Sequence, residues 1–330
     1  MYNITREMMH PQVREIGTLI RSILPYFKES TFRKINKVML GIPAFRRIRG
    51  MAFEQVYIPR AEESAVGGKL RLCVYSPLER REKVPGILWI HGGGYCIGIP
   101  EQDEGFIRRF VRWHNCVVVA PDYCLATKAP YPAALEDCYT ALLWLKANAA
   151  RYGINPSQLM VGGDSAGGGL TAALTIYARD KGEVSLAFQM PLYPMLDDRM
   201  LTKSSRNNDA PVWNTSSNES AWRLYLRELY QAPDIPAYAA PGRLTDFAGL
   251  PPAATYIGTL DPFHDETVAY MEGLKAAGIP AEYREFEGCY HAFDMLAPKS
   301  APAKEAAAFL NERFEYAMQH CFSDQPEHKR

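Results

Sequence analysis

The sequence lacks several features that would point to whole classes of protein. Its 37 Lys and Arg residues balance 37 Asp and Glu residues, so the basic surplus typical of nucleic-acid binding is missing and we expect no nucleic-acid partner. No run approaches the roughly 18 uninterrupted apolar residues of a membrane helix. The start "MYNITREMMHPQVREIGTLI" has no apolar core followed by a small-residue cleavage site. We therefore expect a cytoplasmic protein without stable membrane insertion.

Disulfide and metal patterns are also missing. The seven cysteines are scattered, form no C-x-x-C pair, and include several inside apolar segments such as "RLCVY" and "NCVVVA". This usage favours buried free thiols in a reducing compartment. There is no HExxH and no Cys/His cluster with the spacing of metal ligands. We expect no cofactor and no metal.

Charge is uneven only at the N-terminal end, where residues 1–50 hold ten Lys/Arg against three Asp/Glu. We interpret this excess as the solvated face of surface helices rather than a membrane-binding surface. Apolar residues at three- and four-residue spacings predict an amphipathic helix over 7–24 that ends near Pro25, and a second, basic helix is expected over 30–40.

From residue 50 onward, short β-rich runs alternate with helical patterns. Strands are expected at 53–59, 70–77, 86–90, 116–123, 158–163, 186–194, 253–258 and 281–288. Helices are expected at 134–153, 165–182, 264–277 and 303–319. The first two strands read as a hairpin, and the rest predict an α/β fold with a mostly parallel sheet covered on both faces. Residues 195–235 are polar, contain the helix-like "ESAWRLYLRELY", and interrupt this rhythm as an insertion.

A single G-x-S-x-G occurs in the chain, at Gly163–Gly167. The pattern alone is weak, but here it follows the strand "QLMV" and opens an alanine-rich helix, the context in which such a serine is a nucleophile. Ser165 is therefore our candidate nucleophile. The alternative is a Gly-rich turn in which Ser165 caps the helix.

A nucleophilic serine needs a base, and the base needs an acid that orients it. On a parallel sheet these are expected on loops after later strands, in the order serine, acid, histidine. Asp261 directly follows the strand at 253–258, and His291 follows the strand "AEYREF", so we choose these two. His264 as the base and Asp265 as the acid remain alternatives. Asp261 could also cap the helix that follows, with Pro262 at its first position.

The stretch "HGGGY" follows the strand "GILWI". Glycines there let backbone N–H groups face a developing negative charge. We expect the oxyanion donors to be the N–H groups of Gly92, Gly93 and Ala166, and His91 to fix the loop rather than act as a base. The chain has no G-x-x-x-x-G-K-[ST], and the glycines do not fit G-x-G-x-x-G, which argues against a phosphate-binding loop.

With these motifs in order, the sequence resembles the hormone-sensitive-lipase-like esterases of the α/β-hydrolase superfamily, the bacterial family IV enzymes. The matching segments are "HGGGY", "PYPAALEDC", "GDSAGGG", "GLPPA" with "DPFHDE", and "YHAF", which span about residues 85–295. One segment departs from the family. Where the family reads close to DYRLAPE, this chain has "DYCLATK" with Cys124, Thr127 and Lys128, which puts local salt links in doubt more than catalysis.

The resemblance implies a serine carboxylesterase that hydrolyses short- to medium-chain acyl esters, with a small-molecule ester as its partner. It also implies a helical cap formed by 1–49 and 195–235 over a catalytic domain of 50–194 and 236–330. Tyr95, Tyr193 and Trp213 are candidate pocket walls that could equally be core residues. An amidase or deacetylase with the same triad, a non-catalytic receptor on the same fold, and a homodimer all stay open.

Overall fold

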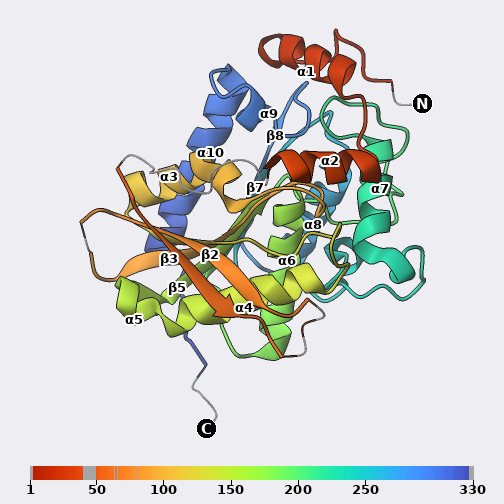
Figure 1. Cartoon of the computed structure of the whole chain (residues 1–330). Coiled ribbons are helices and arrows are strands. Elements are labelled where there is room, and N and C mark those ends of the chain that lie inside the picture. Colours follow the sequence, from red (N-terminus) through yellow and green to blue (C-terminus); the bar gives the residue numbers. More distant parts are fainter. Residues whose placement is uncertain (1–2, 40–49, 63, 65, 80, 327–330) are drawn as a thin grey trace.

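A twisted eight-stranded sheet forms the centre of the molecule (Figure 1). The computed structural model describes residues 3–39, 50–62, 64, 66–79 and 81–326. The strand order is β1-β2-β4-β3-β5-β6-β7-β8. The strands are β1 Ala52–Pro59, β2 Lys69–Ser76, β3 Val84–Ile90, β4 Val117–Pro121, β5 Ile154–Asp164, β6 Phe188–Leu192, β7 Ala253–Gly258 and β8 Ala281–Phe286.

The direction of pairing changes once across this sheet. β2 pairs antiparallel with β1 and with β4, whereas all pairs from β4 to β8 are parallel. The predicted N-terminal hairpin and the predicted mostly parallel sheet are therefore confirmed. Every residue of β3, β4, β6 and β7 is buried, which explains why these strands read as continuous apolar runs rather than as alternating ones.

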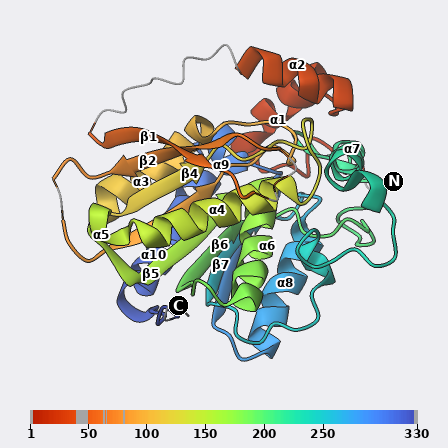
Figure 2. The same ribbon diagram turned by 60° about the horizontal axis from the view of Figure 1, so that its bottom comes forward.

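Helices cover both faces of the sheet (Figure 2). One face carries α4 Ala133–Ala147, α6 Ala166–Lys181 and α8 His264–Ala276, and the other carries α3 Glu104–His114 and α10 Ala301–His320. Short elements join them: α5 Ala149–Tyr152, α9 Phe293–Leu296 and the 3₁₀ turns η1 Pro100–Asp103, η2 Arg227–Leu229 and η3 Pro241–Arg243. This layering is the α/β architecture that the alternating pattern predicts.

Three helices differ from the prediction. No helix was expected over α3, although Phe106, Ile107 and Phe110 place an apolar stripe on its buried face. The helix expected over 134–153 is interrupted at Asn148, which separates α4 from α5. The first helix, α1 Pro11–Ile23, begins later than residue 7, because its first position is a proline and the His10 side chain accepts the N–H of Gln12.

The N-terminal helices lie against the insertion between β6 and β7. The insertion contains α7 Thr215–Leu226, and the second N-terminal helix is α2 Glu29–Met39. Asn214 Nδ2 donates to Pro25 O at 2.6 Å, and Phe27 N donates to Ser217 Oγ at 2.9 Å. The rings of Phe27 and Trp213 are 5.5 Å apart. These contacts join two segments that the sequence analysis assigned to one cap, of which residues 1–2 and 40–49 lie outside the described residues.

Candidate active site

Ser165 sits on a sharp turn between β5 and α6. Its φ of 56° and ψ of −120° belong to a region that residues with a side chain rarely occupy. The turn is held on both sides of the serine side chain, because Ser165 N donates to Leu192 O at 2.9 Å and Ser165 O accepts from Gly169 N at 2.9 Å. This geometry directs the hydroxyl away from the sheet and toward the loops at its carboxyl edge.

The two glycines of the motif permit the turn to pack. A Cβ at Gly163 would lie 2.4 Å from Ile90 O, and a Cβ at Gly167 would lie 2.0 Å from the same oxygen. Both distances are far below any tolerable contact with backbone. The strand β3 and the helix α6 can therefore approach each other only if both positions lack a side chain.

Ser165, His291 and Asp261 form one hydrogen-bonded chain. Ser165 Oγ is 2.8 Å from His291 Nε2, and His291 Nδ1 is 2.7 Å from Asp261 Oδ2. All three side chains are buried. His291 lies in the loop after β8, and Asp261 lies in the loop after β7. The structure thus brings together the three residues selected from the order of motifs along the chain.

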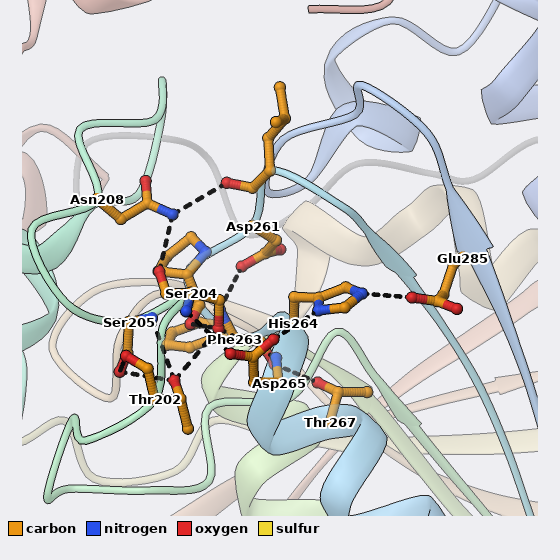
Figure 3. Close-up of polar contacts among 12 residues, drawn as sticks. Thr202, Ser204, Ser205, Asn208, Asp261, Phe263, His264, Asp265, Thr267 and Glu285 are labelled. Atoms are coloured by element: carbon orange, nitrogen blue, oxygen red, sulfur yellow. Dashed lines mark hydrogen bonds and ion pairs between the residues drawn. The ribbon is translucent and has the colours of Figure 1, made fainter. Parts of the chain in front are cut away.

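The alternative base and acid lie in a separate network on the helix α8 (Figure 3). His264 Nδ1 contacts Asp265 Oδ1 at 2.9 Å, and His264 Nε2 contacts Glu285 Oε1 at 2.5 Å. Burial alone would lower the pKa of His264, but hydrogen bonds to Asp265 and Glu285 raise it. Both of its ring nitrogens are therefore engaged with carboxylates rather than with Ser165.

The expected capping of α8 by Asp261 is only partly right. Asp261 Oδ1 accepts the N–H of Phe263 at 2.9 Å, but α8 begins at His264, so Pro262 is not its first residue. The carboxylate uses one oxygen on its own loop and the other on His291. Local hydrogen bonding and orientation of the histidine coexist in one side chain.

The glycine loop after β3 requires a correction at Gly92. Its N–H donates to Asp164 Oδ1 at 2.9 Å, so this group is already used within the protein and does not face a substrate. Within the described residues, the N–H groups of Gly93 and Ala166 have no such partner. Gly93 has a φ of 120°, and a Cβ there would lie 2.0 Å from Ile97 O, which excludes other residues from this position.

A pair of buried carboxyl groups stands behind this loop. Asp164 holds Gly92, and Asp103 accepts the indole N–H of Trp89 at 2.9 Å through Oδ2. Burial raises the pKa of Asp164 to about 6 and raises the pKa of Asp103 well above its usual range. Of the two, Asp103 has the pKa that burial raises further, so it favours the protonated form more strongly than Asp164, which accepts the N–H of Gly92. Sequence reasoning missed Asp103, which lies eight residues after the "HGGGY" motif and belongs to no motif itself.

His91 is buried beside the same loop. Burial lowers the pKa of His91 to about 4, so the ring is neutral near pH 7. Its Nδ1 is 2.8 Å from Gly92 O, and the ring stacks on Tyr123 with centroids 4.2 Å apart. These contacts fix the loop, which agrees with the part expected of His91.

The three aromatic residues expected in the pocket lie in different surroundings. Tyr193 and Trp213 lie 5.2 Å and 6.3 Å from His291 between ring centroids. Trp213 also covers the glycine loop, since a Cβ at Gly94 would meet its ring at 2.3 Å. Tyr95 instead stacks on Tyr225 at 4.0 Å, and its hydroxyl donates to Met195 O. Tyr95 is thus a core residue next to the site.

The segment that departs from the family pattern is well anchored. Cys124 N donates to Asp137 Oδ2 at 2.8 Å, and Asp137 Oδ1 accepts from Arg60 Nε at 2.8 Å. Asp137 is nearly inaccessible to solvent, so its carboxylate needs both partners. Arg60, from the end of β1, supplies the positive charge, and the cysteine supplies only its backbone.

The fold and the serine site together define an α/β hydrolase. The family described as having the alpha/beta hydrolase fold matches residues 87–295, and the chain belongs to this family, in its hormone-sensitive-lipase-like branch. The resemblance found from the motifs is therefore confirmed. Among the residues described, none of the helices combines the length and apolar character that a membrane span requires.

Named relatives are esterases. The chain is 35% identical over 274 residues to the esterase LipI of Mycobacterium tuberculosis, an alignment covering 81% of this chain and 85% of that protein. It is 35% identical over 256 residues to the carboxylesterase NlhH of the same species, covering 74% and 79%. Among solved structures, the Bacterial Heroin Esterase superposes with a TM-score of 0.86 at 32% identity, covering 96% of this chain and 99% of that one.

Proposed function

We propose that this carboxylic ester hydrolase cleaves short- to medium-chain acyl esters with Ser165 as nucleophile, His291 as general base and acid, and Asp261 as the residue that orients the histidine. The observation that carries the proposal is the unbroken chain Ser165 Oγ–His291 Nε2 and His291 Nδ1–Asp261 Oδ2 at 2.8 and 2.7 Å. These distances suit proton transfer from the hydroxyl as it attacks.

The reaction is a two-step acyl transfer. Ser165 Oγ attacks the ester carbonyl while His291 Nε2 accepts the hydroxyl proton, and His291 then gives this proton to the leaving alcohol. Water, deprotonated by the same nitrogen, hydrolyses the acyl-enzyme and frees the serine. Asp261 keeps the proton on Nδ1 and stabilises the positive ring that forms during each step.

The negative charge on the carbonyl oxygen is stabilised by backbone donors. We assign this part to the N–H groups of Gly93 and Ala166, because the N–H of Gly92 is used by Asp164. Each such donor contributes roughly 3–4 kcal/mol to other acyl-transfer enzymes. Asp164 and Asp103 act indirectly, by holding the loop on which Gly93 lies.

The N-terminal helices and the insertion around α7 act as a cap in this proposal. The close packing of Phe27 and Phe32 on Trp213, and of Trp213 near His291, supports an aromatic lid over the serine. Rings that close to the base leave room for small acyl groups better than for long chains. The seven buried thiols are in keeping with a reducing, cytoplasmic location.

The experiment is a set of nitrophenyl esters of increasing acyl length, with aryl amides alongside, tested on the wild type and Ser165→Ala. We expect cleavage of short esters and a loss of about 10³-fold or more in kcat for Ser165→Ala. Ser30→Ala, an exposed serine on α2, is the matched control and should keep full activity.

The same set separates the alternatives. Undiminished hydrolysis by Ser165→Ala would remove the nucleophile from the proposal. Failure of a fluorophosphonate to label the wild type would point to a receptor, and faster cleavage of amides than of esters would point to an amidase.

A further inference from the structure

The loop that carries Asp261 is held by a short segment of the insertion. We call residues 260–265 the acid loop and residues 202–208 the clamp segment. The acid loop runs from the end of β7 to the start of α8. Figure 3 shows side chains of the clamp segment in contact with it. The two segments are more than 50 residues apart in sequence, as the separation of 52 between Asn208 and Leu260 shows.

The clamp segment binds the backbone on both sides of Asp261. Asn208 Nδ2 donates to Leu260 O at 3.2 Å, the carbonyl just before Asp261. Ser204 Oγ donates to Pro262 O at 3.1 Å, the carbonyl just after it. The peptide units flanking the catalytic carboxylate are therefore both fixed by side chains from another part of the chain.

A reciprocal pair of contacts continues this attachment into α8. Ser204 N donates to Asp265 Oδ2 at 3.0 Å, and Asp265 N donates to Ser204 Oγ at 3.0 Å. Ser204 Oγ thus accepts one hydrogen bond and donates another. Its hydroxyl bonds two residues of the acid loop, and it also lies 3.3 Å from Thr202 Oγ1.

Asn208 is committed in the same way. Its amide nitrogen also donates to Ser204 O at 2.9 Å, and its amide oxygen accepts the N–H of Ala210 at 2.8 Å. Ser204 and Asn208 are both buried. Buried polar groups with every hydrogen bond made hold a backbone more rigidly than exposed ones, because no water can replace a lost partner.

The clamp segment is also joined to the aromatic wall of the site. Asn208 N donates to Thr215 Oγ1 at 2.8 Å, and Thr215 N donates to Asn208 O at 3.0 Å. Thr215 opens α7, two residues after Trp213, whose ring lies near His291. One short stretch therefore bonds the backbone on both sides of the proposed acid and the first residue of the helix that follows Trp213.

We propose that Ser204 and Asn208 are positioning residues, which fix the direction of the Asp261 carboxylate by binding the carbonyls on either side of it. The proposal rests on the proposed triad. Asp261 must present one oxygen to His291 Nδ1 at 2.7 Å, and its own χ angles alone do not determine where that oxygen lies. Once Leu260 and Pro262 are held, the carboxylate has one position relative to the ring.

Two substitutions remove these contacts at little cost in volume. Asn208→Asp keeps the shape and the acceptor for Ala210 N, but it replaces the amide donor by a carboxylate oxygen facing two carbonyls. Ser204→Ala removes the hydroxyl alone. We expect Ser204→Ala to lower kcat on a short nitrophenyl ester by roughly 10- to 100-fold with KM little changed, and Asn208→Asp, which also buries a carboxylate against two carbonyls, to lower it at least as much, since misplacing a group of the triad affects the transition state more than binding.

The control is Arg206→Ala, an exposed position within the clamp segment, which should leave kcat unchanged. Ser204→Thr restores a hydroxyl and should recover most of the rate. A second readout is the low-field proton resonance of the His291 Nδ1–H, which we expect to weaken or shift in Asn208→Asp. Thermal unfolding shows that each variant is folded at the assay temperature.

A double-variant cycle decides whether the effect passes through Asp261. In the Asp261→Asn background, adding Asn208→Asp should cost little further activity, because the group being positioned is already gone. A full additional loss in that background would overturn the proposal and leave a general structural effect. Wild-type kcat in folded Asn208→Asp and Ser204→Ala would overturn it as well.

The failure of this proposal is distinct from failure of the triad. If Ser165→Ala is inactive and the two clamp variants are fully active, only the positioning is wrong. If Ser165→Ala remains active, the proposed triad itself is wrong.

Discussion

At the scale of single residues, Asp164 connects the serine turn after β5 to the glycine loop after β3. It precedes the nucleophile on β5, while its side chain holds the glycine loop after β3 through Gly92 N at 2.9 Å. The G-x-S-x-G pattern leaves this position free, yet here it supplies a carboxylate that organises the loop bearing the proposed oxyanion donor. Asp103, which accepts the indole N–H of Trp89, is likewise buried, and burial raises its pKa.

The carboxyl pair predicts a dependence of stability on pH. Because burial raises the pKa of both groups, to about 6 for Asp164, the folded protein holds more protons on the pair than the unfolded chain. The stabilisation is complete below the unfolded pKa near 4 and is lost as pH rises through the folded pKa values. Asp103→Asn removes one titrating group and keeps the shape of the side chain.

We expect Asp103→Asn to flatten the fall in the free energy of unfolding between pH 5 and pH 8, by on the order of 1–3 kcal/mol. Urea unfolding at the two pH values measures this fall. Asp234→Asn, at an exposed position, should not change it. A steeper fall in Asp103→Asn would mean that the pair is not protonated in the way described.

Some of these residues could be predicted from the sequence, and others could not. The proximity of Ser165, Asp261 and His291 was predictable because parallel strands place successive loops at one edge of the sheet, so order along the chain becomes proximity in space. Gly92 was assigned wrongly because a pattern of glycines does not reveal which N–H is already bonded to a side chain. Ser204 and Asn208 were not found because their contacts join distant segments and carry no local pattern.

At the scale of elements, α1 packs directly on the loop that carries His291. Tyr290 Oη donates to Val13 O at 2.8 Å, and Gly288 O accepts from His10 N at 2.8 Å. A Cβ at Gly17 would lie 2.5 Å from Tyr290 Cε1. The helix therefore contacts the ring of Tyr290 at Gly17. Tyr290 in turn precedes His291, the proposed base, in the sequence.

This contact predicts opposite effects for two helix glycines. Gly17→Ala should lower stability by roughly 1–3 kcal/mol, because overpacking against the buried Tyr290 outweighs the better helix propensity of alanine. It should also lower kcat, since Tyr290 adjoins His291. Gly105→Ala in α3, where a Cβ meets nothing within 4 Å, should raise stability by about 0.5–1 kcal/mol.

Urea unfolding and ester hydrolysis of both variants test this pair of predictions. Equal stability in the two variants would show that the ring of Tyr290 moves aside without cost. Sequence analysis did not predict the helix α3. Its stripe of apolar residues is present in the sequence, but the segment lies between two strongly apolar strands, and these dominate the local pattern.

At the scale of the whole molecule, the core contains all seven cysteines. Each is free and buried, as the scattered odd number of thiols suggested. Burial raises the pKa of Cys73 and of Cys289 to about 12, and it raises the pKa values of the other five in the same direction. The thiolate, which is the reactive form, is therefore scarce throughout the folded protein.

We expect the native protein to show no rapid reaction with a disulfide reagent such as dithionitrobenzoate at pH 8, and seven reactive thiols once it is unfolded in guanidinium. Absorbance of the released thiol counts them. Cys321 and Cys124 are the least deeply buried, at 6% and 4% exposed, and should react first as denaturant is added. Fast labelling of any thiol in the absence of denaturant would contradict this reading of the core.

The contact between Val13 and Tyr290 has a consequence for how the protein is made. The two residues are 277 positions apart, so this contact joins a helix to a loop that is synthesised much later. Domains synthesised from the N-terminus fold as their chain emerges, but α1 has this partner only after the 277 residues that follow Val13 are translated. Until that point α1 lacks the loop on which it packs, and for the 126 residues after Ser165 the nascent chain has the serine turn without His291.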